Sequence, residues 1–288
     1  MASLLLPGGR ALALEPFCVM AIVNVTPDSF YAPSRRRALD EALAASLAAV
    51  AAGAAVIDLG GESTRPGAEY VGLEEELERV IPAVEALRRE SAIPISVDTR
   101  KAEVARLALA AGADLVNDVS ALGDPAMAGV AAAAGAGLVL MHMKGQPTTM
   151  QDAPSYDDCP AEVRDFLAAA ASRALSAGVA PASIALDPGI GFGKRLEDNL
   201  ALLSRLDVVA ALGYPLLVGL SRKSFVGALT GRPPEGRLAG SLGAACAAHA
   251  RGGRIFRVHD VAETRDALAL YVASLSGHPG LETGRKDG

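Results

Sequence analysis

Hydrophobic residues gather in eight short runs along the chain, and each run is rich in leucine or in β-branched residues. In chain order they are Cys18 to Val25, Ala55 to Gly61, Pro94 to Thr99, Leu115 to Ser120, Gly137 to Met143, Ile184 to Gly189, Pro215 to Ser221 and Ile255 to Asp260. Continuous apolar runs of this length are typical of strands that are buried on both faces of a sheet. The pattern therefore predicts eight buried strands.

Longer segments rich in Ala, Leu, Glu and Arg separate these runs and have helical spacing. Examples are Leu73 to Arg89, Lys101 to Ala111, Pro160 to Ala177 and Arg237 to Arg251. Regular alternation of strand and helix requires a parallel sheet with right-handed crossovers. Eight such units in 288 residues predict an α/β fold, the (β/α)8 TIM barrel. An open doubly wound sheet is the alternative.

The ends of the chain differ from the repeating part, but nothing resembles a linker. We expect one domain over residues 1–288, in which residues 1–16 cover the N-terminal mouth of the barrel and residues 277–288 form a mobile tail. The apolar stretch Ala2 to Leu14 lacks a basic leader and is interrupted at Pro7, so we expect no signal peptide. Gly, Pro or charged residues interrupt every apolar run before the roughly 20 residues of a membrane-spanning helix.

Charge and cysteine content limit the classes of binding partner and of structural site that we expect. The formal net charge is -6 and no long Lys/Arg block is present, which argues against nucleic acid or an anionic membrane as partner and favours a small molecule. The three cysteines are far apart and lack CxxC spacing, so a disulfide framework or a structural zinc site is not expected. A cytoplasmic location fits this composition.

Polar residues follow nearly every predicted strand. They are Asn24, Glu62 to Arg65, Asp98, Asn117 with Asp118, His142, Asp187, Ser221 to Lys223, and Arg257 with His259. Because a barrel brings the carboxyl ends of its strands to one mouth, these residues predict a single active site there. An Asp after a strand also commonly caps a helix or forms an Asx-turn. For Asp118 and Asp260 we favour that structural role.

The cations among these residues suggest an anion site. Guanidinium and ammonium groups of Arg65, Lys223 and Arg257, together with His259, can neutralise phosphate oxygens. Arg257 and His259 are two residues apart on a strand and should face the same side. The alternative is an ion pair with Asp260 or Glu263.

The acids and amides suggest a second kind of contact. Asp98, Asn117 and Asp187 suit a neutral heterocycle with adjacent N–H donors, because a carboxylate accepts two parallel hydrogen bonds. They could instead be ligands of Mg²⁺, although Mg²⁺ usually keeps several waters and binds substrate phosphates.

The glycine-rich segment Gly189 to Lys194 follows Asp187 and lacks the spacing of a P-loop. Phe192 could form an apolar wall for a flat ligand, or the segment could be a plain turn. His249 lies within an Ala-rich helix and should be a packing residue. For His142 a site role and a packing role are equally supported.

Taken together, these motifs resemble the dihydropteroate synthase family across nearly the whole chain. The matching segments are Asn24 to Phe30, Gly60 to Gly67, Ser96 to Thr99, Asn117 to Val119, Met141 to Met143 with Thr149 to Gln151, Asp187 to Lys194, Ser221 to Phe225 and Arg257 to Asp260. Eight motifs in the right order make the resemblance specific.

The resemblance implies a transferase of folate biosynthesis that uses Mg²⁺. Such an enzyme condenses 6-hydroxymethyl-7,8-dihydropterin diphosphate with 4-aminobenzoate, gives 7,8-dihydropteroate and pyrophosphate, and is a target of sulfonamides. It also implies a homodimer packed through the later, Ala-rich helices. By resemblance, the pterin residues are Asp98, Asn117, Asp187 and Lys223. Those for the diphosphate and its Mg²⁺ are Asn24, Arg257 and His259, and Asn24 is the metal ligand. Those for 4-aminobenzoate are Thr64, Arg65, Pro66, Phe192 and Ser224.

The sequence departs from the family pattern in its first loop. Tyr31 to Ser34 and the arginines Arg35 to Arg37 stand where the family commonly has Ser-Asp-Gly-Gly. The arginines could supplement the diphosphate site, but a solvated loop face is favoured. Two alternatives share the barrel, namely a pterin-dependent methyltransferase and a non-catalytic pterin-binding paralogue. From the residues alone, Lys223 could also be the Schiff-base lysine of an aldolase.

Overall fold

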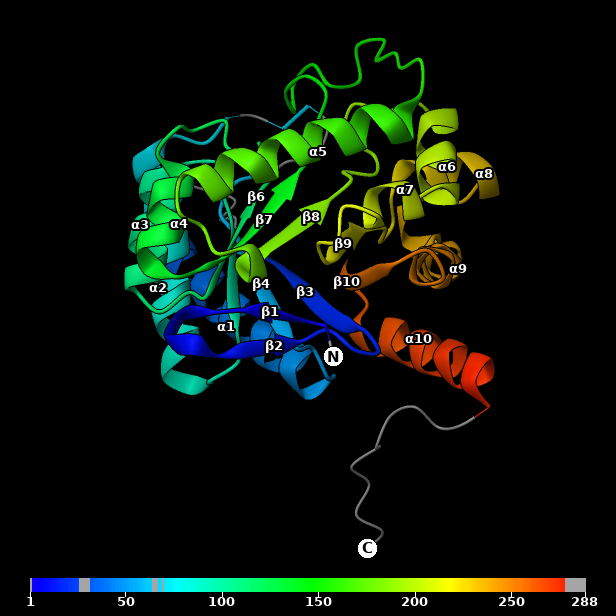
Figure 1. Cartoon of the computed structure of the whole chain (residues 1–288). Coiled ribbons are helices and arrows are strands. Elements are labelled where there is room, and N and C mark those ends of the chain that lie inside the picture. Colours follow the sequence, from blue (N-terminus) through cyan, green and yellow to red (C-terminus); the bar gives the residue numbers. More distant parts are fainter. Residues whose placement is uncertain (1, 26–31, 64–66, 69, 278–288) are drawn as a thin grey trace, which may run out of the picture.

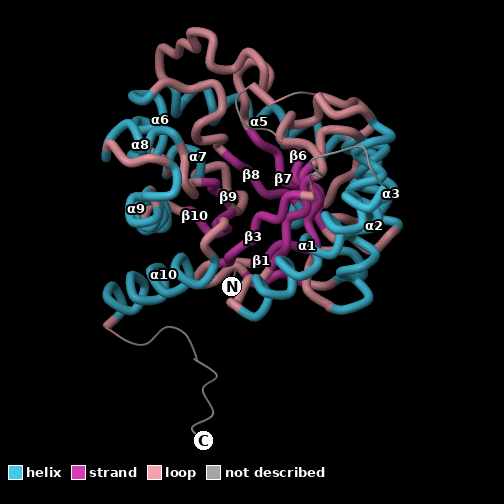
Figure 2. Tube along the Cα trace, turned by 180° about the vertical axis from the view of Figure 1, so that it is seen from behind, coloured by secondary structure: helices cyan, strands magenta, loops and turns pink. Residues whose placement is uncertain are grey.

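The computed structural model describes residues 2–25, 32–63, 67–68 and 70–277. Within them, eight parallel strands close into a barrel in the order β10-β3-β4-β5-β6-β7-β8-β9. The strands occupy the centre and the helices surround them, as Figures 1 and 2 show from opposite sides. Strand β10 pairs with both β3 and β9, which confirms the predicted barrel and excludes the open sheet.

The strands of the barrel lie where the apolar runs predict them. They are β3 (Cys18–Asn24), β4 (Val56–Gly60), β5 (Ile95–Asp98), β6 (Leu115–Asp118), β7 (Gly137–Met141), β8 (Ile184–Asp187), β9 (Leu216–Gly219) and β10 (Gly253–Val258). The helices are α1 (Ala32–Ala51), α2 (Leu73–Glu90), α3 (Ala102–Ala110), α4 (Met127–Ala134), α5 (Cys159–Ser176), α6 (Leu196–Ser204), α7 (Asp207–Ala210), α8 (Ser224–Thr230), α9 (Leu238–His249) and α10 (Val261–Ser276). Helices α7 and α8 are too short to produce a clear apolar period in the sequence.

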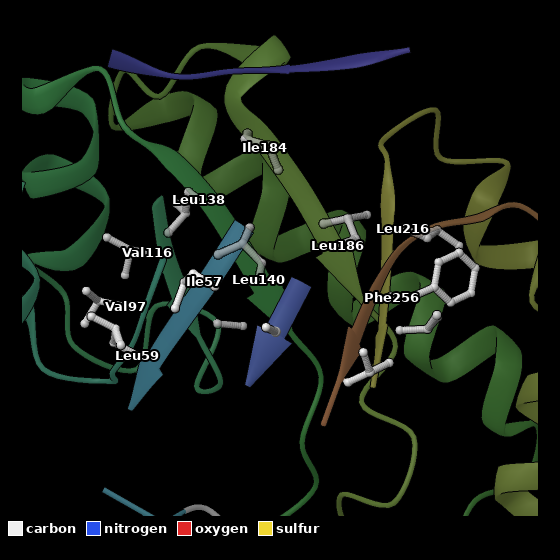
Figure 3. Close-up of a cluster of buried hydrophobic side chains, with 14 of the residues drawn as sticks. Ile57, Leu59, Val97, Val116, Leu138, Leu140, Ile184, Leu186, Leu216 and Phe256 are labelled. Atoms are coloured by element: carbon white, nitrogen blue, oxygen red, sulfur yellow. The ribbon is translucent and has the colours of Figure 1, made fainter. Parts of the chain in front are cut away.

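Residues at alternate positions of each strand point outward and pack under the helices. Ile57, Val97 and Val116 belong to this outer layer, as do Leu140 and Phe256, and all are almost fully buried. Figure 3 shows these side chains around the barrel wall. The intervening positions therefore face the lumen, and what they carry decides the chemistry inside the barrel.

A short hairpin lies against the N-terminal ends of the strands. It is formed by β1 (Ser3–Leu5) and β2 (Ala11–Ala13), which pair antiparallel. The hairpin leucines form one cluster with lumen residues from the beginnings of seven strands; its members are Leu4, Leu6, Leu12, Leu14, Cys18, Met20, Val56, Leu115, Val139, Ala185, Leu217 and Ile255. This apolar contact closes the N-terminal end of the lumen, so a ligand is left with the carboxyl end of the strands.

Helix α10 ends at Ser276, and Gly277 takes the left-handed backbone conformation that commonly ends a helix. The remaining residues of the expected tail lie outside the described part of the chain. Among the described helices, none combines the length and apolar character needed to cross a membrane.

Candidate active site

Polar side chains replace the apolar lumen layer toward the carboxyl ends of the strands. Asp58, Asp98, Asn117, Asp187 and Arg257 occupy the lumen-facing positions of β4, β5, β6, β8 and β10. Each follows a small or apolar lumen residue by two positions, because side chains of a strand alternate between its faces. The predicted convergence of distant strand ends at one mouth is thus realised.

Arg257 joins two of the strands across the lumen. Its Nε donates to Asp58 Oδ2 at 2.5 Å and its Nη2 donates to Asp98 Oδ2 at 2.6 Å. Asn117 Nδ2 also donates to Asp58 Oδ2, at 3.2 Å. Both aspartates are buried, so the attraction is weakly screened by solvent. The alternative prediction, an ion pair of Arg257 with Asp260 or Glu263, is wrong. The side chain of Arg257 enters the lumen and does not lie along the outer surface.

Several oxygens of this layer remain available to a ligand. The second carboxylate oxygens of Asp58 and Asp98, and the amide oxygen of Asn117, are buried and have no hydrogen-bond partner in the described part of the chain. Burial, opposed by Arg257 and reinforced by Asp58, raises the pKa of Asp98 to about 7. A buried acceptor without a partner is costly, so these three atoms are well suited to accept N–H groups of a bound molecule.

The other half of the layer comes from β8 and the loop after β9. Asp187 Oδ1 accepts from the Gly189 N–H at 2.7 Å. The Lys223 ammonium lies 4.0 Å from the centre of the Phe192 ring, within the range of a cation–π contact. Burial, opposed by Asp187, lowers the pKa of Lys223 to about 8. A carboxylate, an ammonium and an aromatic face thus lie together.

The two halves form one electrostatic unit. The charges of Asp187, Arg257 and Asp98 all act on the pKa of Lys223, and Lys223 and Arg257 both oppose the burial that raises the pKa of Asp187. Interactions of this kind require close approach. Residues that are up to 199 positions apart in the sequence, Asp58 and Arg257, therefore share one site.

The rim of the mouth carries smaller polar groups. His259 Nδ1 lies 3.0 Å from Ser221 Oγ, and His259 and Ser224 are both exposed, as is Asn24 at the end of β3. Ser224 is the first residue of α8. The other three predicted residues of the aminobenzoate set lie outside the described residues, namely Thr64, Arg65 and Pro66.

Few of the described side chains at this mouth could coordinate a metal ion. The described residues contain no group of three or more His, Cys, Asp or Glu side chains that could hold a metal ion. Asn24 does offer one exposed amide oxygen, a hard donor of the type that Mg²⁺ prefers. This donor set fits a Mg²⁺ ion that is bound mainly by water and by the phosphates of a substrate.

Other sequence predictions are settled by the contacts. The Asp118 carboxylate accepts from the Ser120 and Leu122 N–H groups at 2.9 and 2.7 Å, which confirms its role in the turn. Asp260 precedes α10 but pairs with Arg222 at 3.0 and 2.5 Å and caps no N–H group. Its structural role is confirmed, and the expected cap is wrong.

His142 and His249 are packing residues. His249 Nε2 lies 2.9 Å from the Pro16 carbonyl oxygen, and its ring stacks on Phe256, as predicted. His142 is buried with its ring edge-on to Phe166 at 4.8 Å, on the outer side of the barrel beneath α5. This resolves the open question about His142 in favour of packing.

The arginine cluster lies in a helix. Helix α1 begins at Ala32, so the expected loop face for Arg35 to Arg37 is wrong, although Arg36 is exposed as expected. Arg37 pairs at 2.7 Å with Glu41, one helical turn away, and is 82% exposed. Such a pair is typical of a solvated helix surface.

Two buried charged residues beside the site, Asp58 and Lys194, were not predicted as site residues. Asp58 is 0% exposed and lies within β4, before the strand end. A carboxylate flanked by Ile57 and Leu59 in an apolar run was the signal that could have identified it. Lys194 is also buried, but nothing in its glycine-rich surroundings distinguishes it from an exposed loop lysine.

These features define a barrel enzyme whose mouth binds a flat, hydrogen-bonding and partly anionic small molecule. Residues 20–259 match the Pterin binding enzyme family, and the chain belongs to that family. The dihydropteroate synthase of Escherichia coli (strain K12) is 47% identical over 268 residues, which cover 93% of this chain and 95% of that protein.

Solved structures agree with this assignment. The dihydropteroate synthase of Xanthomonas albilineans with 4-aminobenzoic acid has a TM-score of 0.88 and 47% identity, and covers 96% of this chain and 98% of that one. That of Burkholderia cenocepacia complexed with 7,8-dihydropteroate has a TM-score of 0.86 and 46% identity, with 96% and 97% covered.

Proposed function

We propose that this protein is a transferase that condenses 6-hydroxymethyl-7,8-dihydropterin diphosphate with 4-aminobenzoate. The products are 7,8-dihydropteroate and pyrophosphate. One observation carries the proposal: Asp98, Asn117, Asp187, Lys223 and Arg257 lie together at the mouth of one barrel. The bound molecules named for the similar structures, 4-aminobenzoic acid and 7,8-dihydropteroate, are a substrate and the product of this reaction.

The pterin ring matches the lumen layer in its pattern of donors and acceptors. Its 2-amino group and N3–H lie side by side and suit the carboxylate of Asp187, and its 4-oxo group suits the Lys223 ammonium. On the other side of the ring, the unpaired oxygens of Asp98 and Asn117 can accept further N–H groups. A flat heterocycle thus uses groups from four strand ends.

The diphosphate belongs at the rim, near the cations. Two nitrogens of the Arg257 guanidinium already donate to Asp58 and Asp98, which leaves the N–H groups of Nη1 to donate to a phosphate oxygen. His259 at the exposed rim can donate to the same group. Asn24 would hold Mg²⁺, which when bound supplies positive charge to the departing pyrophosphate.

Catalysis in this site depends on charge and position. Loss of diphosphate leaves positive charge on the exocyclic methylene and the pterin ring, which nearby carboxylates such as Asp98 stabilise. The aniline nitrogen of 4-aminobenzoate then attacks that carbon and gives up one proton, which water or the released pyrophosphate takes up. The site contributes by holding the two reactants in line. No protein nucleophile is needed, so Lys223 acts as a hydrogen-bond donor and forms no Schiff base.

The second substrate fits beside the loop after β8. Phe192 is half-buried and offers an apolar face to the aminobenzoate ring, and Ser224 at the beginning of α8 can donate to its carboxylate. Thr64, Arg65 and Pro66 complete the proposed pocket on the grounds of family resemblance. Sulfonamides, which resemble 4-aminobenzoate in shape and charge, are expected to compete there.

The decisive experiment measures pyrophosphate release by the purified protein. Release is expected only when both substrates and Mg²⁺ are present, and it should be matched by formation of 7,8-dihydropteroate. Binding of the pterin diphosphate without turnover would instead identify a non-catalytic paralogue. Transfer of a methyl group to a corrinoid protein would identify the methyltransferase alternative, which the relatives do not favour.

We further propose a homodimer in the cytoplasm. The family resemblance supports a dimer formed through the Ala-rich helices late in the chain, and several leucines there are exposed, including Leu229, Leu270 and Leu275. Sedimentation equilibrium of the purified protein tests the dimer. Fractionation of cells that express it tests the location.

A further inference from the structure

Lys194 is a buried lysine whose ammonium group faces only neutral acceptors. Its Nζ donates to the Gly189 carbonyl oxygen at 2.9 Å and to the Phe192 carbonyl oxygen at 3.1 Å, and lies 2.9 Å from His142 Nδ1. The side chain is almost fully buried. No carboxylate lies within ion-pair distance of Nζ among the described residues, so only the more distant charges of Asp187 and Asp198 offset the lost hydration.

The charged form of Lys194 has three N–H donors and no acceptor, so in that form His142 Nδ1 accepts the third hydrogen bond. The neutral amine has two donors and a lone pair, and would instead accept from a protonated Nδ1. Burial, reinforced by Lys194, lowers the pKa of His142 to about 3, so the imidazole is neutral in either case.

This arrangement is expensive for folding. Burial lowers the pKa of Lys194 to about 7, and a buried ammonium without an ionic partner is one of the least favourable groups in a protein interior. An apolar side chain of similar length would avoid the cost of the buried charge, but it would leave the Phe192 carbonyl oxygen without this donor. The position of Lys194 therefore calls for an explanation beyond stability.

The hydrogen bonds of Lys194 hold the loop after β8 against the loop after β7. Gly189 and Gly193 have positive φ angles. A Cβ on Gly189 would lie 1.8 Å from the His142 carbonyl oxygen, and a Cβ on Gly193 would lie 2.2 Å from the Lys144 carbonyl oxygen. The backbones of the two loops are thus in direct contact. Lys194 reaches back over the loop and joins its first turn, Gly189 to Phe192, to the ring of His142.

The held loop presents an aromatic ring to the active site. The Phe192 carbonyl is fixed by Lys194, and the Phe192 ring lies 4.0 Å from the Lys223 ammonium. Lys223 in turn interacts with Asp187 at the centre of the polar layer. A chain of contacts therefore runs from Lys194 through Phe192 to the groups that meet the substrates.

We propose that Lys194 is a positioning residue, which fixes the loop 188–194 so that Phe192 and Lys223 are held in their substrate-binding arrangement. The kinetic test of this inference rests on the proposed function. The structural test, by hydrogen exchange, rests on geometry alone. Lys194 acts through its contacts with Gly189, Phe192 and His142, and the proposal assigns it no contact with a substrate.

The test compares Lys194→Met with Lys144→Met. Methionine keeps the length of the lysine side chain but removes its charge and its donors. Lys144 is 44% exposed and lies on the neighbouring loop, which makes it a matched control for the same substitution. Methionine removes a buried charge but leaves the Phe192 carbonyl oxygen without its Lys194 donor. These two effects on the unfolding temperature oppose each other, so thermal denaturation of both variants is measured beside the kinetics.

The functional loss should appear in substrate affinity. For Lys194→Met we expect KM for both substrates, and Kd for the probe 6-hydroxymethylpterin, to rise on the order of tenfold, as is usual when a supporting residue of a binding group is removed. The kcat should change much less, and Lys144→Met should match the wild type. A merely structural role would lower the active fraction, which reduces kcat and leaves KM unchanged.

Hydrogen exchange tests the geometry without any substrate. The Phe192 N–H donates to the Gly189 carbonyl at 3.0 Å and the Gly191 N–H donates to Asn199 at 2.6 Å. Both amides should exchange faster in Lys194→Met. If the wild-type protein binds no pterin, the proposed function fails while this measurement still decides the role of Lys194. Unchanged exchange together with unchanged KM would overturn the proposal.

Two further variants control for misfolding of Lys194→Met and for effects that do not pass through Phe192. Lys194→Gln retains two N–H donors and should recover part of the lost affinity if Lys194→Met is poorly folded. In a Phe192→Leu background, Lys194→Met should add little further loss, because the two residues act on the same contact. Fully additive losses would contradict the path through Phe192.

Discussion

Arg257 is the residue whose removal most directly tests the electrostatic design of the site. It is 19% exposed and donates to two carboxylates, those of Asp58 at 0% and Asp98 at 7% side-chain exposure. Arg257→Ala leaves both acids buried in the lumen without their shared cation. Removing one member of a buried ionic group is much more costly than the net value of the group, because the remaining charges keep their desolvation penalty.

The expected loss in the free energy of unfolding is about 3–5 kcal/mol at neutral pH. It should be smaller in acid. Without Arg257, burial and Asp58 act unopposed on Asp98, so the folded-state pKa of Asp98 rises above its already raised value of about 7. A folded state that binds more protons than the unfolded state loses stability as pH rises. The deficit of the variant should therefore grow between pH 5 and pH 8.

Urea denaturation at these two pH values measures both effects. The matched control is Arg254→Ala on the same strand. Within the described part of the chain, the one ion pair of Arg254 is with the part-exposed Glu15 at 3.4 Å, and its other hydrogen bonds go to backbone carbonyl oxygens, so this variant should lose much less stability. A deficit below about 1 kcal/mol, typical of a surface pair, would refute the picture of a buried ionic centre. So would a deficit that is identical at pH 5 and pH 8.

Three further predictions concern ligand binding and the fold. Asp187→Ala should abolish pterin binding in calorimetry, since it removes the carboxylate that we assign to the paired N–H donors; retained binding would move the pterin elsewhere. Because burial lowers the pKa of Lys223 to about 8, pterin affinity should fall as pH rises through that value, and titrations of Lys223→Met should lack this component; an unchanged profile would remove Lys223 from the pterin site. Gly189→Ala should cost at least about 2 kcal/mol of folding free energy in urea titrations, because left-handed backbone is unfavourable for alanine and its Cβ would lie 1.8 Å from the His142 carbonyl oxygen. In contrast, Gly129→Ala, in open space on α4, should stabilise the protein slightly.

The fold was readily predicted because the signal is strong and repeated. All eight barrel strands overlap the apolar runs, and the segment Leu73 to Arg89 differs from α2 by a single residue at its end. A strand that is buried on both faces appears in the sequence as a continuous apolar run, and each helix between strands has an apolar side that covers the sheet. The hairpin at residues 3–13 is made of three-residue strands, which are too short for a pattern to identify.

The site was only partly predictable. Strand-end positions such as Asp98, Asp187 and Arg257 could be predicted because strand length and direction bring them to one mouth. Their partners could not, because a contact between Arg257 and Asp58 joins residues 199 positions apart and depends on the register of several strands. Lys194 gave no sequence signal at all, since its burial results from the packing of two loops.

The amino-acid sequence alone determined the barrel, the end of it that carries the chemistry and the types of group found there. These follow from local rules, namely the apolar period of each segment and the side to which alternate side chains point. Only the tertiary structure decided which charges neutralise each other, which acceptors stay unpaired and which lysine is buried. Such contacts are made between strands and loops that are distant in the chain, and closing the ring sets their distances.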